Sequence, residues 1–176
     1  SRNYLAFSQA ALDGGADMLT LHARTRSQGY APWAEWETLA TLKRYVTDGG
    51  YTAPVFGSGD LFEPVDAQRM LAETGIDGVM FARGAIGNPM VFNQAKAILR
   101  GEEVVPLSRR ELQSLIIRHL DLMIAHYGEE AACKAMRKHS AAYLKGIGHS
   151  SSIKQALVQA VRREHYLTAL NALVDL

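Results

Sequence analysis

The chain has 176 residues, of which 48% are hydrophobic and 21% are charged, as in an ordinary globular protein. Its formal net charge is +1, and Cys133 is the one cysteine, which excludes an internal disulfide and favours a reducing, cytoplasmic setting. No run approaches the roughly 18 apolar residues of a membrane-spanning helix, so we expect no contact with a membrane.

The charge is unevenly distributed along the chain. Residues 1–103 carry 9 Lys and Arg against 12 Asp and Glu, whereas residues 104–176 carry 10 against 6. A polyanionic partner is therefore expected to bind the second part. The alternative is a chance difference between solvated, charged surfaces.

The first part of the chain alternates between predicted helices and short apolar strands. Buried strands are predicted at Met18–Leu21, Ala53–Phe56 and Gly78–Phe81. Helices are predicted at Tyr4–Asp13, Glu35–Tyr45, Glu63–Glu73 and from Pro89 to Arg100, with an irregular loop at Ser27–Ala34. Buried strands joined by helices form parallel βαβ units, so this part is predicted to be an α/β structure.

Polar residues follow each predicted strand, at His22–Arg26, Gly57–Asp60 and Ala82–Ala85. In a barrel of βα units this end of the strands carries the active site, and the last two loops commonly bind a phosphate. Arg83 adds a full positive charge there and is the leading candidate for an anion contact.

The other residues of these turns have two interpretations each. Asp60 either accepts a hydrogen bond from a ligand hydroxyl or caps the following helix. Gly57 and Gly59 either allow close approach of a ligand or simply form a tight turn. His22 either donates to a ligand or only ends its strand.

The second part of the chain is predicted to be helical. Glu102–Pro106 reads as a linker, and Ser108 with Glu111 has the form of a capping box that starts a helix. The helices are predicted at 109–127, Glu129–Lys145, Ser150–Arg163 and Tyr166–Asp175. Four helices with short connections predict an up-and-down four-helix bundle.

The second of these helices carries a candidate RNA-binding face. Lys134, Lys138 and Lys145 are expected on one side, with Arg137 and His139 adjacent. Such a face can follow RNA phosphates, although a solvated helix surface has the same pattern.

Two other residue types in this part are given structural roles. Cys133, set among alanines, is expected to be buried. His119 and His126 lack a third ligand, so no metal site is expected and they are taken as interfacial or exposed.

Taken together, these motifs resemble the tRNA-dihydrouridine synthases. The resemblance rests on segments in the same order and spacing as in the family: His22–Thr25, Gly57–Asp60, Met80–Ala85 with Gly87–Pro89, Met136–His139 and Tyr143–Gly146. The family usually has Asn at the position of Ser58 and Gly at that of Ala82. The resemblance covers the later half of a family member.

The resemblance implies a fold and an activity. Residues 1–103 would be the C-terminal portion of a TIM (β/α)8 barrel, with its last three strands and an FMN site, and residues 104–176 an all-α four-helix bundle that binds tRNA. The parent enzyme would reduce uridine in tRNA to 5,6-dihydrouridine, with FMN as cofactor and NADPH or NADH as reductant.

The resemblance also assigns residues to these roles. The FMN-binding residues would be His22, Gly57, Ser58, Gly59, Asp60, Ala82 and Arg83. The tRNA-binding residues would be Arg24, Lys134, Arg137, Lys138, His139 and Lys145. The cysteine that acts as general acid in the family would lie upstream, so no catalytic residue is expected here.

The isolated chain is accordingly expected to be inactive and, with its sheet edges open, to self-associate. Two other functions stay open. One is a different FMN-dependent barrel oxidoreductase that acts on a small molecule. The other is a non-catalytic RNA-binding fragment.

Overall fold

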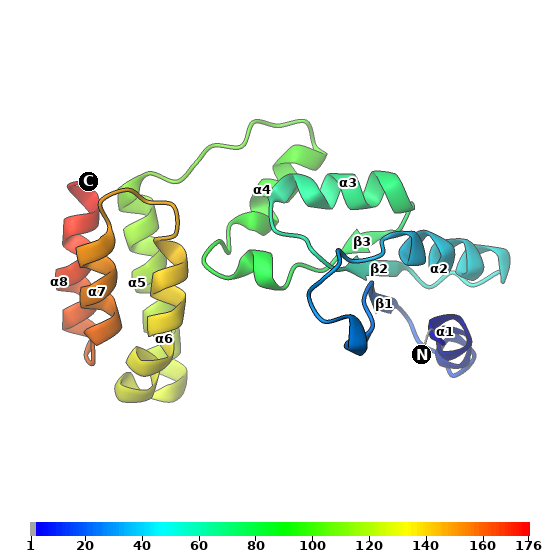
Figure 1. Ribbon diagram of the computed structural model, residues 1–176, viewed down its shortest axis with the longest axis horizontal. Helices are drawn as coiled ribbons and strands as arrows, with labels where there is room; N and C mark the ends of the chain where they lie inside the picture. The colour runs from blue at the N-terminus through cyan, green and yellow to red at the C-terminus, as the bar shows by residue number, and fades with distance from the viewer. Residues whose placement is uncertain (1–2) are drawn as a thin grey trace. The chain divides into compact units, whose positions relative to one another are not determined.

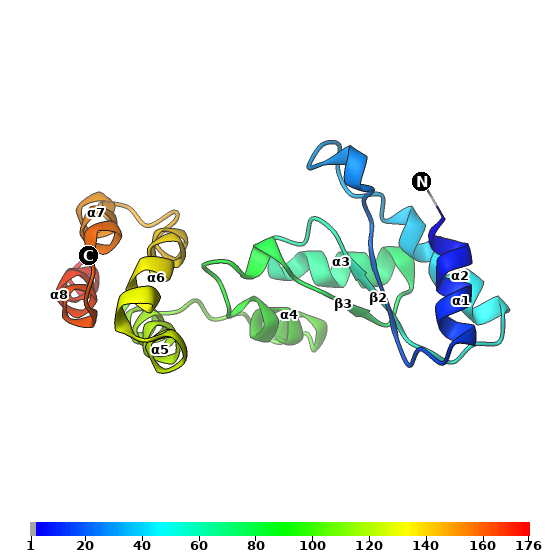
Figure 2. The same cartoon turned by 90° about the horizontal axis from the view of Figure 1, so that it is seen from below.

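The computed structural model describes residues 3–176, and they form two compact units (Figures 1 and 2). The first unit contains the residues up to 85 together with 90–103, and the second contains residues 86–89 and 104–176. The protein is an α/β structure in which many helices accompany one small parallel sheet.

The sheet lies in the first unit and has the order β1-β2-β3. Its strands are β1 (Leu19–His22), β2 (Val55–Ser58) and β3 (Gly78–Val79), and all pairs are parallel. His22 lies opposite Ser58, and Gly57 lies opposite Val79. The carboxyl ends of all three strands therefore meet at one edge of the sheet.

The three strands were predicted in the right order but with wrong bounds. Met18 and Ala53 precede their strands, and the third strand ends at Val79 instead of Phe81. Hydrophobicity marks buried segments, whereas the ladder decides where a strand begins and ends. Pro54 has no N–H to contribute, and its carbonyl accepts from the Leu19 amide at 3.0 Å just before the β1–β2 ladder begins.

Helices of the first unit pack in sequence order, α1 on α2, α2 on α3 and α3 on α4. Their bounds are α1 (Tyr4–Asp13), α2 (Glu37–Asp48), α3 (Pro64–Thr74) and α4 (Val91–Leu99), with short 3-10 turns η1 (Arg26–Gln28) and η2 (Arg83–Ala85). The bounds predicted for α1 are confirmed. Leu39 and Met70 from the helices and Val55 from the sheet are fully buried in one core.

The second unit consists of four helices around a separate core. They are α5 (Arg109–Tyr127), α6 (Glu129–Tyr143), α7 (Ser151–Gln159) and α8 (Arg163–Val174). The predicted capping box is confirmed, because Ser108 accepts from the Glu111 amide and Glu111 accepts in return from the Ser108 amide.

The predicted bounds of three helices in this unit are wrong, including those of the last helix, which was predicted at Tyr166–Asp175 and is observed at Arg163–Val174. Helix α6 ends at Tyr143, so Lys145 lies beyond it. The helix predicted over Ser150–Arg163 ends at Gln159, because Ala160 and Arg162 have extended backbone angles, and α8 starts at Arg163. Apolar periodicity continues through these residues, and only the backbone geometry separates the two helices.

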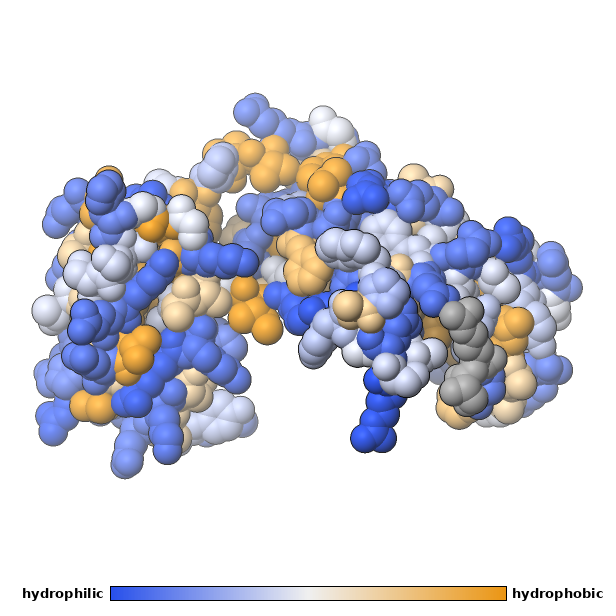
Figure 3. All heavy atoms as spheres, in the orientation of Figure 1, coloured by the Kyte–Doolittle hydropathy of each residue, from blue (hydrophilic) through white to orange (hydrophobic). Residues whose placement is uncertain are grey.

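The core of the second unit includes Leu120, Met136, Leu170 and Tyr166. The Tyr166 hydroxyl donates to the Cys133 carbonyl at 2.8 Å, and burial raises the pKa of Tyr166 to about 12. Cys133 is buried, as predicted. The face of the unit seen in Figure 3 is mostly hydrophilic, and within residues 3–176 no helix is long and apolar enough to span a membrane.

Candidate functional site

Residues from the ends of all three strands line one small hollow. Its walls come from His22 at the end of β1, from Ser58 at the end of β2 and the residues through Phe62, and from Met80, Ala82 and Arg83 after β3. Six of the seven residues predicted to bind a cofactor are among them. The hollow holds about 20 Å³ in this arrangement of side chains, which is room for about one water molecule.

The Asp60 carboxylate lies at the centre of this arrangement. Its Oδ2 accepts from Arg24 and, at 2.7 Å, from the Ala34 amide, while its Oδ1 accepts from Arg83 at 2.8 Å. The side chain is only 5% exposed. Asp60 does not cap α3, whose capping box is formed by Glu63 and Asp66, so that alternative for Asp60 was wrong.

The environment of Asp60 keeps it ionised. Burial by itself would raise the pKa of Asp60. The hydrogen bonds from the Ala34 amide and Arg24, together with the charges of Arg24 and Arg83, outweigh burial and hold the pKa below its usual range. The site therefore contains two guanidinium groups around one carboxylate, with an excess of one positive charge.

Arg83 is the part of this cluster that reaches solvent, with 39% of its side chain exposed. Its guanidinium lies 4.4 Å from the centre of the Tyr30 ring and 4.9 Å from that of Phe62. Sequence reasoning missed both aromatic residues. Tyr30 lies in an irregular loop, where no periodicity could have indicated its contact with Arg83, and cation–π pairing has no sequence signature.

Arg24 has a different environment from the one predicted for a tRNA contact. Its side chain is 4% exposed and, besides Asp60, donates to the carbonyls of Gly29 at 3.0 Å and Pro32 at 2.6 Å. The guanidinium thus holds the loop after β1 against the turn after β2. In this arrangement Arg24 faces protein atoms, and a role in tRNA binding through direct contact is not supported by the geometry.

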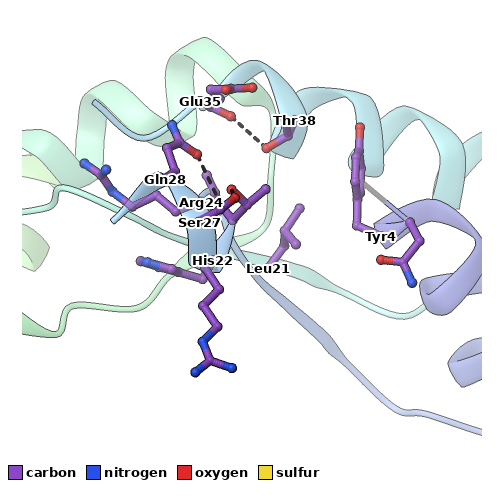
Figure 4. A pocket seen from close by; sticks show the side chains of 12 residues that line it. Tyr4, Leu21, His22, Arg24, Ser27, Gln28, Glu35 and Thr38 are labelled. Carbon is purple, nitrogen blue, oxygen red and sulfur yellow. Dashed lines mark hydrogen bonds between the residues drawn. The ribbon is translucent and has the colours of Figure 1, made fainter. Parts of the chain in front are cut away.

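A larger hollow of about 700 Å³ lies beside the end of β1. Figure 4 shows His22 and Arg24 from the strand end, Gln28 from η1, Thr38 from α2 and Tyr4 from α1 around it. Thr38 donates to the Glu35 carbonyl at 2.7 Å at the start of α2. His22 lines both hollows and is exposed, so it is accessible to a ligand.

Gly57 in β2 and Gly59 in the turn after it are needed for packing. A Cβ at Gly57 would lie 2.5 Å from Ile76 and 2.7 Å from Leu39, inside the core. A Cβ at Gly59 would lie 2.7 Å from that of Ala34, and the φ of Gly59 is +135°. Gly57 belongs to β2 and faces the helices, so a direct ligand contact through its missing side chain is not supported.

In the second unit, the predicted basic residues differ in accessibility. Lys134 and Lys138 lie one turn apart on α6 and are exposed, as is Lys145 beyond the helix end. Arg137 is partly buried, and its Nη2 lies 3.4 Å from the Ala160 carbonyl. The exposed positive charge on this face therefore comes from the three lysines.

His139 belongs to a partly buried cluster between α5 and α6. Its ring centre is 5.0 Å from that of His119, and His119 Nδ1 is 3.1 Å from the Tyr143 hydroxyl. Burial lowers the pKa of His119. The pKa of His139 is also lowered, mainly by burial and to a smaller extent by the nearby charges of His119 and Lys138. His126 is exposed. Among the described residues no group of three or more His, Cys, Asp or Glu could hold a metal ion.

A parallel sheet with polar turns at the carboxyl ends of its strands defines a class of α/β proteins that bind ligands at that edge. Within this class the family is known from sequence comparison. The family model described as "Dihydrouridine synthase (Dus)" matches residues 1–175. The chain belongs to the dihydrouridine synthase family.

Named relatives agree with this membership. The chain is 44% identical to a "Probable tRNA-dihydrouridine synthase" of Treponema pallidum over 139 residues, which are 79% of this chain and 41% of the relative. It is 34% identical to "tRNA-dihydrouridine synthase B" of Pseudomonas aeruginosa, with 82% and 42% of the two chains covered. A protein of the same name from Pasteurella multocida is 29% identical, with 100% and 52% covered. The chain thus spans between 41% and 52% of the length of these relatives.

Proposed function

We propose that the whole protein reduces uridine in tRNA to 5,6-dihydrouridine, with FMN as cofactor and NADPH or NADH as reductant. The observation that carries the proposal is the family match over residues 1–175. The names of the relatives, which are those of tRNA-dihydrouridine synthases, support it. A cytoplasmic location is part of the proposal, since the one cysteine suits a reducing compartment.

Under this proposal the two parts of the chain bind different molecules. Residues 1–103 are three βα units of a TIM-type (β/α)8 barrel that binds FMN, and residues 104–176 are a four-helix bundle that binds tRNA. The parallel order of β1, β2 and β3, with one helix between consecutive strands, supports the first assignment. The exposed lysines of α6 support the second.

The residues at the strand ends have the chemistry that a flavin phosphate requires. Arg83 offers an exposed guanidinium and His22 an exposed imidazole, while Ser58, which is buried, and Ala82 line the hollow beside them. The hollow of about 20 Å³ is too small for a phosphate, so the phosphate would contact Arg83 on its exposed side, outside the hollow. When bound, FMN supplies hydride transfer between the nicotinamide and the uracil double bond.

The cofactor assignment is tested by replacing Arg83 with Ala. The variant should lose FMN, because a bidentate, charge-assisted contact with the phosphate is removed. Flavin absorbance remaining after dialysis of the whole protein measures this. Arg100→Ala, which removes an exposed arginine just after α4 that pairs with Glu102, is the matched control and should retain the cofactor. Equal retention in both variants would remove Arg83 from the site.

The tRNA assignment is tested by charge reversal on α6. Lys134→Glu with Lys138→Glu should weaken tRNA binding and lower the slope of log affinity against log salt by about 1 to 2, since each phosphate contact contributes close to one unit. Lys96→Glu with Arg100→Glu makes the same change in net charge at the same spacing, at the C-terminal end of α4. Indistinguishable slopes for the two double variants would return the α6 lysines to the role of a solvated surface.

We also propose that the 176-residue chain on its own self-associates. Within residues 3–176, β1 and β3 each pair with another strand on one side only. Unpaired strand edges present rows of N–H and C=O groups that can pair with another chain. A two-fold pair would bury the same edge in both copies.

A further inference from the structure

One carboxylate connects the turns that follow all three strands. Arg24 follows β1, Asp60 follows β2 and Arg83 follows β3. Arg24 donates to Oδ2 of Asp60 and Arg83 donates to Oδ1. The Ala34 amide also donates to Oδ2, at 2.7 Å.

The position of Asp60 is poorly suited to contact with a ligand. Its side chain is 5% exposed, and both of its oxygens already accept hydrogen bonds from the protein. Arg83, by contrast, is 39% exposed, and a guanidinium carries five N–H donors, so the pair with Asp60 leaves it capacity for an anion. The exposed member of the pair is therefore the one placed to meet a ligand.

The loop after β1 is held by the same carboxylate. Arg24 ties Asp60 to the carbonyls of Gly29 and Pro32, and the Trp36 indole donates to the Gly59 carbonyl at 2.9 Å. The loop in turn presents the Tyr30 ring to the Arg83 guanidinium at 4.4 Å. Asp60 thus restrains Arg83 directly and also through the loop.

We propose that the Asp60 carboxylate is a positioning group, which orients Arg83 and the loop after β1 for an anionic group and does not itself contact the cofactor. This inference rests on the proposed function and changes the role first predicted for Asp60. One carboxylate between two guanidinium groups leaves the excess of positive charge that a phosphate needs. Asp60 holds Arg83 in one region of space, which reduces the conformational entropy that phosphate binding must remove.

The experiment compares FMN with riboflavin, which has the same ribityl chain and ring but no phosphate. In the whole protein, Asp60→Asn should weaken FMN binding by roughly tenfold or more and riboflavin binding by no more than about twofold, because the charge that orients Arg83 is lost. A merely structural defect would weaken both flavins alike. Binding is followed by quenching of flavin fluorescence.

Asp77→Asn is the matched control. Asp77 also accepts from a backbone amide, that of Val55 at 2.7 Å, and from an ammonium group, that of Lys43. It precedes β3, at the opposite end of the strands from the candidate site. Its replacement should leave both flavin affinities within about twofold of the wild-type values.

A double-mutant cycle with Arg83→Ala sharpens the test. If Asp60 acts through Arg83, Asp60→Asn should add little further loss of FMN affinity in the Arg83→Ala background. Independent, additive losses would overturn the proposal, as would equal weakening of FMN and riboflavin by Asp60→Asn, which indicates direct contact with the ribityl chain. Unchanged affinities in Asp60→Asn would overturn it as well.

Failure of the proposed function gives a different result. In that case the wild-type protein binds neither flavin, and the side-chain N–H signal of Arg83 in NMR spectra decides the positioning role. A shifted or broadened signal in Asp60→Asn, together with an unchanged signal in Asp77→Asn, supports it. An unchanged signal in both variants overturns it.

Discussion

Gly84 shows how closely the turns of the first unit approach one another. A Cβ at this position would lie 2.3 Å from the carbonyl oxygen of Leu61 and 2.9 Å from the Cα of Phe62. Both neighbours are backbone atoms, which cannot move aside as the end of a side chain can. The turn that carries Arg83 is therefore seated directly on the segment that follows Asp60.

Gly84→Ala should lower the free energy of unfolding of the first unit by about 1–3 kcal/mol, as expected of an overpacked site. Urea unfolding followed by tryptophan fluorescence measures this, because both tryptophans, Trp33 and Trp36, belong to the first unit. Gly148→Ala is the control, since a Cβ there meets nothing within 4 Å. Equal unfolding midpoints for the two variants would contradict the close-contact argument.

At the scale of elements, the contact between α5 and α6 contains the two partly buried histidines. The ring centres of His119 and His139 lie 5.0 Å apart, with the rings tilted by 56°. Tyr143 and Lys138 are the other titratable groups of the cluster. Burial lowers the pKa of both histidines from the ordinary 6.5. The packed helices thus favour the neutral imidazole, whereas the unfolded chain does not.

This difference predicts how stability changes with pH. Below pH 6.5, the pKa of the unfolded chain, the unfolded state binds protons that the folded state does not. The contribution of the two histidines to stability is therefore complete above this pKa and is lost as the pH falls through their lower folded pKa values. His119→Gln with His139→Gln should flatten that dependence. Urea unfolding followed by far-UV circular dichroism measures it, and the exposed His126→Gln is the control. A slope unchanged in the double variant would exclude the cluster as its source.

At the scale of the whole molecule, β1 is an edge strand that is only partly covered. Thr20 and His22 on β1 are exposed, while Leu19 and Leu21 alternate with them and are partly buried. In the part of the chain that the structure describes, the outer edge of β1 has no partner strand. Apolar residues next to an unpaired edge favour pairing with a second copy.

Sedimentation of the purified 176-residue chain tests the proposed self-association. We expect a dimer or larger species at micromolar concentration, and a shift toward monomer in Thr20→Lys, because a charge at an edge strand opposes edge pairing. Ser114→Lys, an equal charge change on the exposed side of α5, should sediment like the wild type. A monomeric wild-type chain would contradict the proposal.

The sequence by itself determined the features that depend on neighbouring residues. The bounds of α1 follow from apolar spacing and from Gly14, and the start of α5 follows from the capping box at Ser108. The order of the three strands and the polar turns after them were also predictable. Each of these signals lies within one or two helical turns of the residue that it concerns.

Only the tertiary structure decided which strand-end residues meet. Arg24 lies 36 residues before Asp60 and Arg83 lies 23 residues after it, so no local pattern links them, and their pairing depends on the parallel register of the sheet. Because of this register, β2 continues to Ser58, opposite His22, and not only to the predicted Phe56. The same register places Asp60 as a buried partner of two arginines, which the sequence did not indicate, because the energy of a charge depends on what surrounds it in space.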